Sequence, residues 1–348
     1  MKRIAYIEID THAEIAQAFL EIMKGSASFS VDYYFSEKIK SQVDDHGEPV
    51  FSSDSSVILE QLKDKKYDLV VIGTVHRFFN TFQAIVARHH AAVIVHNLNF
   101  IKASGAGLVR SIFKKDRMYR MKLLWKEGLL GAPEVYRGAE NLLVLDEALV
   151  SEKFRFLPLF FTQPGIVPEN KSVTVVIPGG VSQQRRDYRH IFTVIRMLKP
   201  EKPYHFIFLG KAQGNELREL ETLSQELPHH IRITYFSKRV SSGEFTARMQ
   251  EADVLWCPIQ EKTEFFSRQE IYGKTKMTGN LGDAIKFGKW AVFPANYQSG
   301  LDFIVLEQKD IISQFERLKD TPYDFQKQYG KPAVQAKLER LLEELTAI

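Results

Sequence analysis

The chain has 348 residues, of which 44% are hydrophobic and 12% aromatic, enough apolar material for two domains of ordinary size. Its 47 basic and 43 acidic side chains leave a net charge of +4, which is too small to indicate nucleic-acid binding. The single cysteine, Cys257, excludes an internal disulfide and is typical of a reducing compartment. The first residues lack the apolar core of a signal peptide, and no run reaches the roughly 20 apolar residues of a membrane span. We therefore expect a cytoplasmic protein.

In the first half of the chain, short apolar runs alternate with amphipathic stretches. The runs predict strands over residues 3–9, 29–35, 67–74, 91–98, 141–149 and 154–161, and the stretches predict helices over 13–24, 56–65 and 79–89. Strands that are apolar on both faces and are separated by helices are typical of a parallel sheet in an α/β domain. Residues 162–172 contain two prolines and a glycine, and they predict a linker.

The same alternation restarts after the linker. Strands are predicted over residues 172–180, 205–210, 231–237, 253–259 and 289–294, and helices over 189–199, 215–227, 242–252 and 334–345, with one more opened by Gly282 and Asp283. We therefore predict an α/β fold of two tandem Rossmann-like, doubly wound domains with a cleft between them. The expected units are residues 1–165, residues 166–325 and a C-terminal helix within 326–348. Ligands of such sheets bind beyond the carboxyl ends of the strands.

One of these strand ends carries a candidate phosphate site. Gly179 and Gly180 form a turn, and Arg185 and Arg186 follow just before a helix. Guanidinium groups bind phosphate oxygens in bidentate fashion and keep their charge, which favours a phosphate ligand here. The alternative is a β-turn with two solvated arginines. The loop does not have the Walker pattern, and the first strand-to-helix turn lacks the G-x-G-x-x-G of a dehydrogenase.

Residues 270–289 hold a second pattern of this kind. Two lysines supply positive charge, small residues let backbone N–H groups approach an anion, and a helix N-terminus adds a partial positive charge. Asp283, expected in the first helical turn, can accept hydrogen bonds from ribose hydroxyls. The alternative is a lysine-rich surface loop with an ordinary aspartate cap. The candidate residues are Tyr272, Lys274, Lys276, Thr278, Gly279, Asn280, Leu281 and Asp283.

Other strand ends carry polar or basic residues as well. Gly210 and the run Lys238, Arg239 and Val240 are expected to form the floor and wall of a nucleotide-base site, or else to be exposed loops. In the first half, strands end at His76 and His96. We expect His96 to bind substrate hydroxyls, the alternative being a structural histidine. The chain has no D-x-D, no H-E-x-x-H and no cysteine cluster, and so we expect no metal site.

Residues 110–126 concentrate positive charge. The segment has seven basic residues and one acidic residue, Asp116, interleaved with large apolar side chains. This composition favours contact with an anionic membrane leaflet or with a polyprenyl-phosphate acceptor. The alternative is an amphipathic helix that covers the sheet with its basic face in water.

Taken together, the motifs resemble those of the GT-B glycosyltransferases, particularly the large retaining group 1, or family 4, type. The resemblance is clearest from Val173 to Pro294 and rests on three segments in order: GGVSQQRRDY (179–188), EADVLWCP (251–258) and GDAIKFGKWAV (282–292). It implies that Arg186 contacts the donor phosphate and that Asp283 is the ribose ligand. Thr275 stands where the family has a glutamate, and Gly180 stands where an arginine is common.

The resemblance implies hexosyl transfer, with retention and without a metal, from a UDP- or GDP-sugar to a glycan, a lipid-linked molecule or a small molecule. The donor would bind the C-terminal domain and the acceptor the N-terminal domain. The nucleotide-sugar is a co-substrate, and no separate cofactor is expected. We expect no nucleic-acid partner, but we do expect peripheral contact with an anionic membrane. The candidate catalytic residues are His96, Arg186 and Lys276. The alternatives are a nucleotide-sugar epimerase of the same fold and a non-catalytic GT-B-like subunit.

Overall fold

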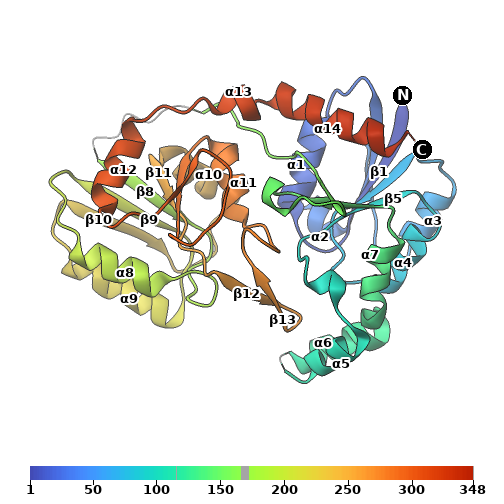
Figure 1. Cartoon of the computed structure of the whole chain (residues 1–348), viewed down its shortest axis with the longest axis horizontal. Coiled ribbons are helices and arrows are strands. Elements are labelled where there is room, and N and C mark those ends of the chain that lie inside the picture. The colour runs from blue at the N-terminus through green and yellow to red at the C-terminus, as the bar shows by residue number, and fades with distance from the viewer. Residues whose placement is uncertain (115, 166–171, 348) are drawn as a thin grey trace.

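A computed structural model describes residues 1–114, 116–165 and 172–347, which form two α/β domains lying side by side (Figure 1). The N-terminal domain contains a parallel seven-stranded sheet in the order β3-β2-β1-β4-β5-β6-β7. Its strands are β1 (Lys2–Glu8), β2 (Phe29–Phe35), β3 (Val50–Ser52), β4 (Leu69–Ile72), β5 (Ala91–Ile94), β6 (Asn141–Val144) and β7 (Phe154–Phe156). Its helices are α1 (Ala13–Met23), α2 (Glu37–Lys40), α3 (Ile58–Lys63), α4 (Phe79–Val86), η1 (Phe100–Lys102), α5 (Gly105–Ile112), α6 (Arg117–Lys126), η2 (Leu129–Gly131), α7 (Ala132–Gly138) and η3 (Glu147–Leu149).

The central strands of this sheet are mostly apolar, and β4 and β5 are apolar at every position, because both of their faces are covered. Alternate residues of a strand point to opposite faces. Ala5 and Ile7 of β1 therefore enter one hydrophobic core, and Ile4 and Tyr6 enter another on the opposite face. All four side chains are fully buried. This is the reason that the strands appear in the sequence as continuous apolar runs rather than as alternating patterns.

The C-terminal domain repeats the architecture with a parallel six-stranded sheet in the order β10-β9-β8-β11-β14-β15. Its strands are β8 (Val173–Pro178), β9 (Tyr204–Lys211), β10 (Ile231–Phe236), β11 (Val254–Trp256), β14 (Trp290–Phe293) and β15 (Ile304–Leu306). Its helices are α8 (Tyr188–Met197), α9 (Gly214–Glu226), α10 (Ser242–Glu251), α11 (Gly279–Phe287) and α12 (Ile311–Asp320). The two-domain, doubly wound α/β fold predicted from the sequence is confirmed.

The end of the chain returns to the N-terminal domain. After α13 (Phe325–Tyr329), the helix α14 (Lys331–Leu345) runs across the top of Figure 1 and packs beside α1. Each large apolar side chain buried in this way contributes about 1.5–3 kcal/mol. Lys2 Nζ donates a 2.8 Å hydrogen bond to Thr346 Oγ1, and this contact ties the two ends of the chain together. The side chains of α14 that enter the N-terminal core are Val334, Leu338, Leu341, Leu342 and Leu345.

Several features differ from the sequence-based expectation. The short edge strands β3 and β15 were not expected, and neither was an antiparallel hairpin of β12 (Lys262–Phe265) and β13 (Arg268–Ile271). The basic stretch 110–126 forms parts of two helices, α5 and α6. Of the predicted linker, residues 166–171 lie outside the described residues.

The expected start of α11 was wrong. The helix begins at Gly279, and Asp283 is its fifth residue rather than a member of its first turn. The reason is the side chain of Thr278, whose Oγ1 accepts a hydrogen bond from the Asn280 N–H at 3.4 Å and caps the helix, so that α11 begins three residues before Gly282.

Candidate functional site

A cavity of about 1160 Å³ lies between the two domains. On the N-terminal side it is lined by α1 with the preceding residue His12, and by residues 159–161 and Gln163. On the C-terminal side it is lined by residues 239–242, by α10 and by α11. His12 and Arg239 follow the carboxyl ends of β1 and β10, and this is the edge at which doubly wound sheets bind ligands.

The first turns of α11 line the C-terminal side of the cavity, and the loop after β8 contacts them through Arg186 and Asn280. Gly179 has a φ of +100°, and a Cβ there would lie 2.2 Å from Arg186 Nη2, so that glycine is required for the guanidinium to lie against the turn. Arg186 donates to Gly180 O and to Asn280 Oδ1, both at 3.4 Å. Its buried Nε has no hydrogen-bond partner among the described residues. The strong donor set of Arg186 is therefore only partly used.

Asn280 links Arg186 to Asp283 by hydrogen bonds. Its Nδ2 donates to Pro178 O at 3.2 Å and to Asp283 Oδ2 at 3.4 Å. Asp283 and Gly279 both line the cavity. Burial raises the pKa of Asp283 to about 6, although the hydrogen bond from Asn280 and the charge of Arg186 oppose this shift. Asp283 is therefore a carboxylate at neutral pH and a protonated acid in mildly acidic solution.

The N-terminal side carries three histidines close together. The His12 and His96 rings stack with their centroids 4.2 Å apart, and His76 lies edge-on at 5.6 Å from His96. His96 Nε2 is 2.8 Å from Gly73 O. The pKa values of His76 and His96 lie well below the usual value. Burial is the largest cause and the charge of His12 is the second, so both rings are neutral. Of the three, only His12 lines the cavity, and the sequence analysis did not select it.

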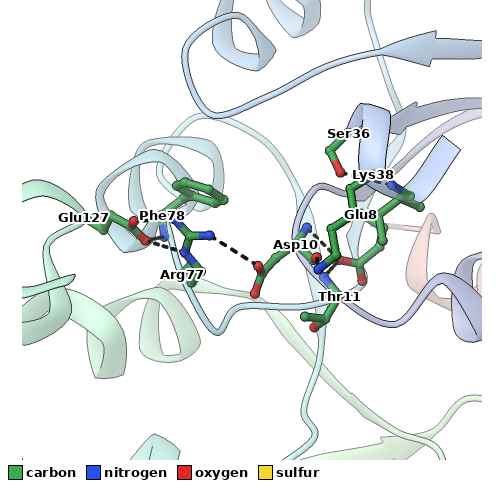
Figure 2. A network of polar contacts seen from close by, with 9 residues as sticks. Glu8, Asp10, Thr11, Ser36, Lys38, Arg77, Phe78 and Glu127 are labelled. Carbon is green, nitrogen blue, oxygen red and sulfur yellow. Dashed lines mark hydrogen bonds and ion pairs between the residues drawn. The ribbon is translucent and has the colours of Figure 1, made fainter. Parts of the chain in front are cut away.

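The loop that carries His12 is held by the polar network drawn in Figure 2. Glu8 Oε1 accepts hydrogen bonds from the Asp10 and Thr11 N–H groups at 3.2 and 3.1 Å. Burial raises the pKa of Glu8 to about 8. His12 itself has a φ of 62°, a left-handed conformation that costs a non-glycine residue about 1–3 kcal/mol. The network around Glu8 holds the two residues before His12, and the His12 Nδ1 lies 2.8 Å from Glu14 Oε1.

Arg77 extends the same network away from the loop. Its guanidinium forms a bidentate pair with Glu127, with Nη2–Oε1 at 2.6 Å and Nε–Oε2 at 3.0 Å, and it lies 3.8 Å from Asp10 Oδ1 (Figure 2). Since its charge is used inside the N-terminal domain, Arg77 is a structural residue.

Lys276 and the hairpin β12–β13 connect the two domains directly. Lys276 Nζ donates to Asn97 Oδ1 at 2.5 Å, and the Leu98 N–H donates to Thr275 O at 2.9 Å. Burial lowers the pKa of Lys276 to about 8. Lys276 therefore lies at the junction of the domains, close to the histidine cluster, rather than on the open wall of the cavity.

Glu270 of the hairpin makes a buried contact between the two domains. Its carboxylate accepts hydrogen bonds from the N–H groups of Asn99 and Phe100 at 3.0 and 2.9 Å, and its side chain is fully buried. Phe265 and Phe266 of the same hairpin pack against the N-terminal core. The hairpin thus joins the C-terminal domain to the segment that follows β5.

The other predicted residues are distributed over several places. Arg239 and Val240 line the cavity, whereas Lys238 and Arg185 are exposed. Gly210 packs on the β8 turn, where a Cβ would lie 2.3 Å from Gly179 O.

Three more of the predicted residues lie apart from the cavity. Tyr272 and Lys274 line a separate pocket of about 20 Å³ together with Asn296 and Tyr297. Leu281 is buried in the C-terminal core. Among the described residues, no group of three or more His, Cys, Asp or Glu side chains is placed to hold a metal ion.

No family model matches the chain, and no curated protein matches it in sequence. Solved structures do match over the whole length. The galactosyltransferase WaaB of the lipopolysaccharide outer core, in its apo form, is 10% identical, with a TM-score of 0.56 over 98% of this chain and 99% of that one. Anabaena HepE in complex with UDP-glucose is 12% identical, with a TM-score of 0.55 over 100% of both chains. The UDP-GlcNAc 2-epimerase from Methanocaldococcus jannaschii is 9% identical, with a TM-score of 0.52 over 98% and 99%.

The architecture of this chain is that of the GT-B glycosyltransferase fold, as the motifs in the sequence implied. At such low identity the likeness concerns the fold alone, so the activity has to be argued from the site.

Proposed function

We propose that the protein is a glycosyltransferase that moves a hexosyl group from a nucleotide-sugar to an acceptor bound in the same cavity. The observation that carries this proposal is the chain of hydrogen bonds from Arg186 through Asn280 to Asp283, which itself lines a cavity between two Rossmann-like domains. The guanidinium, which has unused donors, suits a diphosphate, and the carboxylate suits a ribose diol. The Asn280 side chain hydrogen-bonds to both groups and so holds them next to each other.

In this proposal the donor lies along the C-terminal wall. Arg186 and the N-terminus of α11 near Gly279 hold the diphosphate, Asp283 accepts the ribose hydroxyls, and Arg239 and Val240 border the base. Lys276 joins the diphosphate site when it exchanges Asn97 for a phosphate oxygen. UDP- and GDP-sugars are the donor classes proposed, and the complex of HepE with UDP-glucose supports the first.

The acceptor faces the donor from the N-terminal side, where His12 lines the cavity and stacks on the neutral His96. In the proposed step, the bond between the anomeric carbon and the donor phosphate oxygen breaks, and a bond to an acceptor hydroxyl oxygen forms. The hydroxyl proton passes to an oxygen of the departing diphosphate. The acceptor oxygen bonds to the face of the sugar that the diphosphate leaves, and the configuration is therefore retained. Arg186 and Lys276 stabilise the charge that develops on the leaving group. A glycan, a lipid-linked molecule or a small molecule would suit this site as acceptor.

An epimerase is the second candidate. A structure with the same fold is an epimerase, and the cavity carries carboxylates from opposite domains, Glu14 and Glu21 on one side and Asp283 on the other. An epimerase needs a pair of acid and base groups at the sugar. Incubation of the purified protein with UDP-GlcNAc and other nucleotide-sugars separates the candidates, because an epimerase yields the epimer without any acceptor. A transferase yields the nucleoside diphosphate instead, by slow hydrolysis or by transfer.

The Asp283→Asn variant tests the ribose site. We expect it to bind UDP or GDP at least about tenfold more weakly, since a hydrogen bond to a charged group contributes about 1.5–3 kcal/mol. Binding by the wild type should also weaken as the pH falls below about 6, because the carboxylate is then protonated. The variant should show a smaller pH dependence, since only the terminal phosphate of the nucleotide still titrates in this range. Calorimetric titrations between pH 5 and 8 measure both effects.

The matched control for this variant is the 2′-deoxy nucleotide, which lacks one of the two hydroxyls. Its affinity should respond much less to Asp283→Asn. Because Thr278 and not Asp283 caps α11, the thermal melt of the variant should match that of the wild type. Equal loss of affinity for both nucleotides would place the ribose elsewhere.

We also propose that the reaction needs no metal ion. Lysine, arginine and a helix N-terminus supply the positive charge at the proposed diphosphate site, and the sequence has no D-x-D motif. Donor hydrolysis or transfer should therefore persist at an undiminished rate in excess EDTA. Loss of activity that magnesium or manganese restores would show that the diphosphate is held by a metal.

A further inference from the structure

The helices α5 and α6 project from the lower end of the N-terminal domain in Figure 1. Their outer surface is unusually apolar for solvent-facing helices. Of the twelve large hydrophobic side chains that are exposed among the described residues, six lie between Val109 and Leu130. Scattered exposed apolar residues are normal, whereas a concentration of this kind marks an interaction surface.

The exposed apolar residues of α6 lie on one face. Met118 and Trp125, which are 81% and 75% exposed, are seven residues apart and therefore share a helix face, and Lys122 lies between them on that face. Tyr119 is beside them. Phe113, which follows α5 directly, is 65% exposed. We call the exposed side chains of Phe113, Met118, Tyr119, Lys122, Trp125 and Lys126 the α5–α6 face.

The opposite side of α6 is held by buried contacts, so the helix cannot rotate to bury the α5–α6 face. The Arg120 guanidinium is buried and donates to Ser111 O at 2.5 Å and to Ser267 Oγ at 2.7 Å. Leu123 is fully buried in the N-terminal core. The orientation of α6 is therefore fixed with Met118 and Trp125 in water.

The charge on the α5–α6 face and around it is predominantly positive. Arg110, Lys114 and Arg117 are exposed together with Lys122 and Lys126, and Asp116 is the only exposed acidic residue from Gly105 to Lys126. Within the described residues, none of these five basic side chains forms a salt bridge. Their charges are thus available to an external partner.

From these observations we propose that the α5–α6 face docks on the surface of an anionic lipid bilayer. Aromatic and methionine side chains at a helix surface bury themselves at the boundary of headgroups and acyl chains, while flanking lysines extend to the lipid phosphates. An acidic protein partner would pair with the charges but would leave Met118 and Trp125 without a comparable apolar environment. No described helix is long and apolar enough to cross a bilayer, so the contact is peripheral. The inference does not depend on the proposed transferase activity.

Co-sedimentation with vesicles tests the proposal. The full-length protein is expected to bind vesicles of equal parts phosphatidylglycerol and phosphatidylcholine at low salt, to bind pure phosphatidylcholine far more weakly, and to be released at high salt. Lys122→Glu with Lys126→Glu should lower the apparent affinity by about tenfold or more, because each cation near an anionic surface contributes roughly a fivefold factor. Met118→Ser with Trp125→Ser should reduce binding while leaving its salt dependence in place.

Two control variants make the same kinds of change, charge reversal and loss of apolar side chains, at exposed positions of the C-terminal domain. Lys199→Glu with Lys309→Glu reverses two exposed lysines of the C-terminal domain, and Met197→Ser with Leu306→Ser removes two of its exposed apolar side chains. Both controls should bind vesicles like the wild type. The proposal is overturned if the wild type ignores anionic vesicles at low salt, or if the control variants lose as much binding as the variants of the α5–α6 face. It is also overturned if the protein binds acidic polypeptides but no vesicles.

Discussion

The Arg186→Ala variant is expected to bind UDP or GDP at least about tenfold more weakly than the wild type. Arg186 lies against the glycine turn after β8 with its Nε unpaired, and it is joined to the cavity wall through Asn280. Its removal deletes a charge-assisted contact with the diphosphate that contributes about 1.5–3 kcal/mol. Calorimetry on the purified protein measures the change directly.

Arg189→Ala is the matched control for this variant. Arg189 is an exposed arginine in the first turn of α8, three residues further along the chain, and its loss should leave nucleotide affinity unchanged. The assignment of the diphosphate to the β8 turn fails if Arg186→Ala binds as tightly as the wild type, or if both variants weaken equally. Such a result would also remove the main support for a nucleotide-sugar donor in this cavity.

The second large effect is expected from Glu270→Ala, which removes the buried carboxylate between the two domains. The variant leaves the Asn99 and Phe100 N–H groups without their acceptor, at a cost of about 1–3 kcal/mol for each unsatisfied donor. We expect an earlier urea unfolding midpoint and a larger radius of gyration in small-angle X-ray scattering, since the hairpin then no longer holds the domains together.

Glu264→Ala provides the comparison, because Glu264 is an exposed glutamate on the same hairpin. It should leave both the unfolding midpoint and the scattering profile unchanged. If Glu270→Ala behaves like Glu264→Ala in both measurements, the contact of the hairpin with the N-terminal domain does not determine how the domains are held. Nucleotide affinity of Glu270→Ala, measured alongside, shows whether the domain contact also matters for the donor site.

Much of the fold could be predicted from the local pattern of apolar and polar residues. The apolar runs at β1, β4, β8 and β14 predicted buried parallel strands because both faces of such strands are covered, and burial alone sets their composition. The motif GGVSQQRRDY also lies where it was expected, at the end of a C-terminal strand, since a glycine turn and the residues that follow it are close in the chain.

Local pattern did not reveal the hairpin β12–β13. Its turn places Phe266 and Ser267 at φ values of 46° and 59°, a conformation that the sequence usually signals with asparagine and glycine. Without that signal, the residues resembled an ordinary loop. The start of α11 was placed too late for a related reason, because two residues in the segment can cap a helix and only the geometry of Thr278 shows which one does.

Local sequence was enough to predict most of the buried strands, the glycine and arginine turn and a helix that contains Asp283, because each depends on neighbours only a few residues away. The tertiary structure alone decided that Lys276 meets Asn97, that Glu270 meets Asn99 and Phe100, and that α14 completes the N-terminal core. These contacts join residues about 170 or more positions apart. Periodicity shows which side chains are buried but not which distant group they meet, and that choice is made only when the whole chain packs.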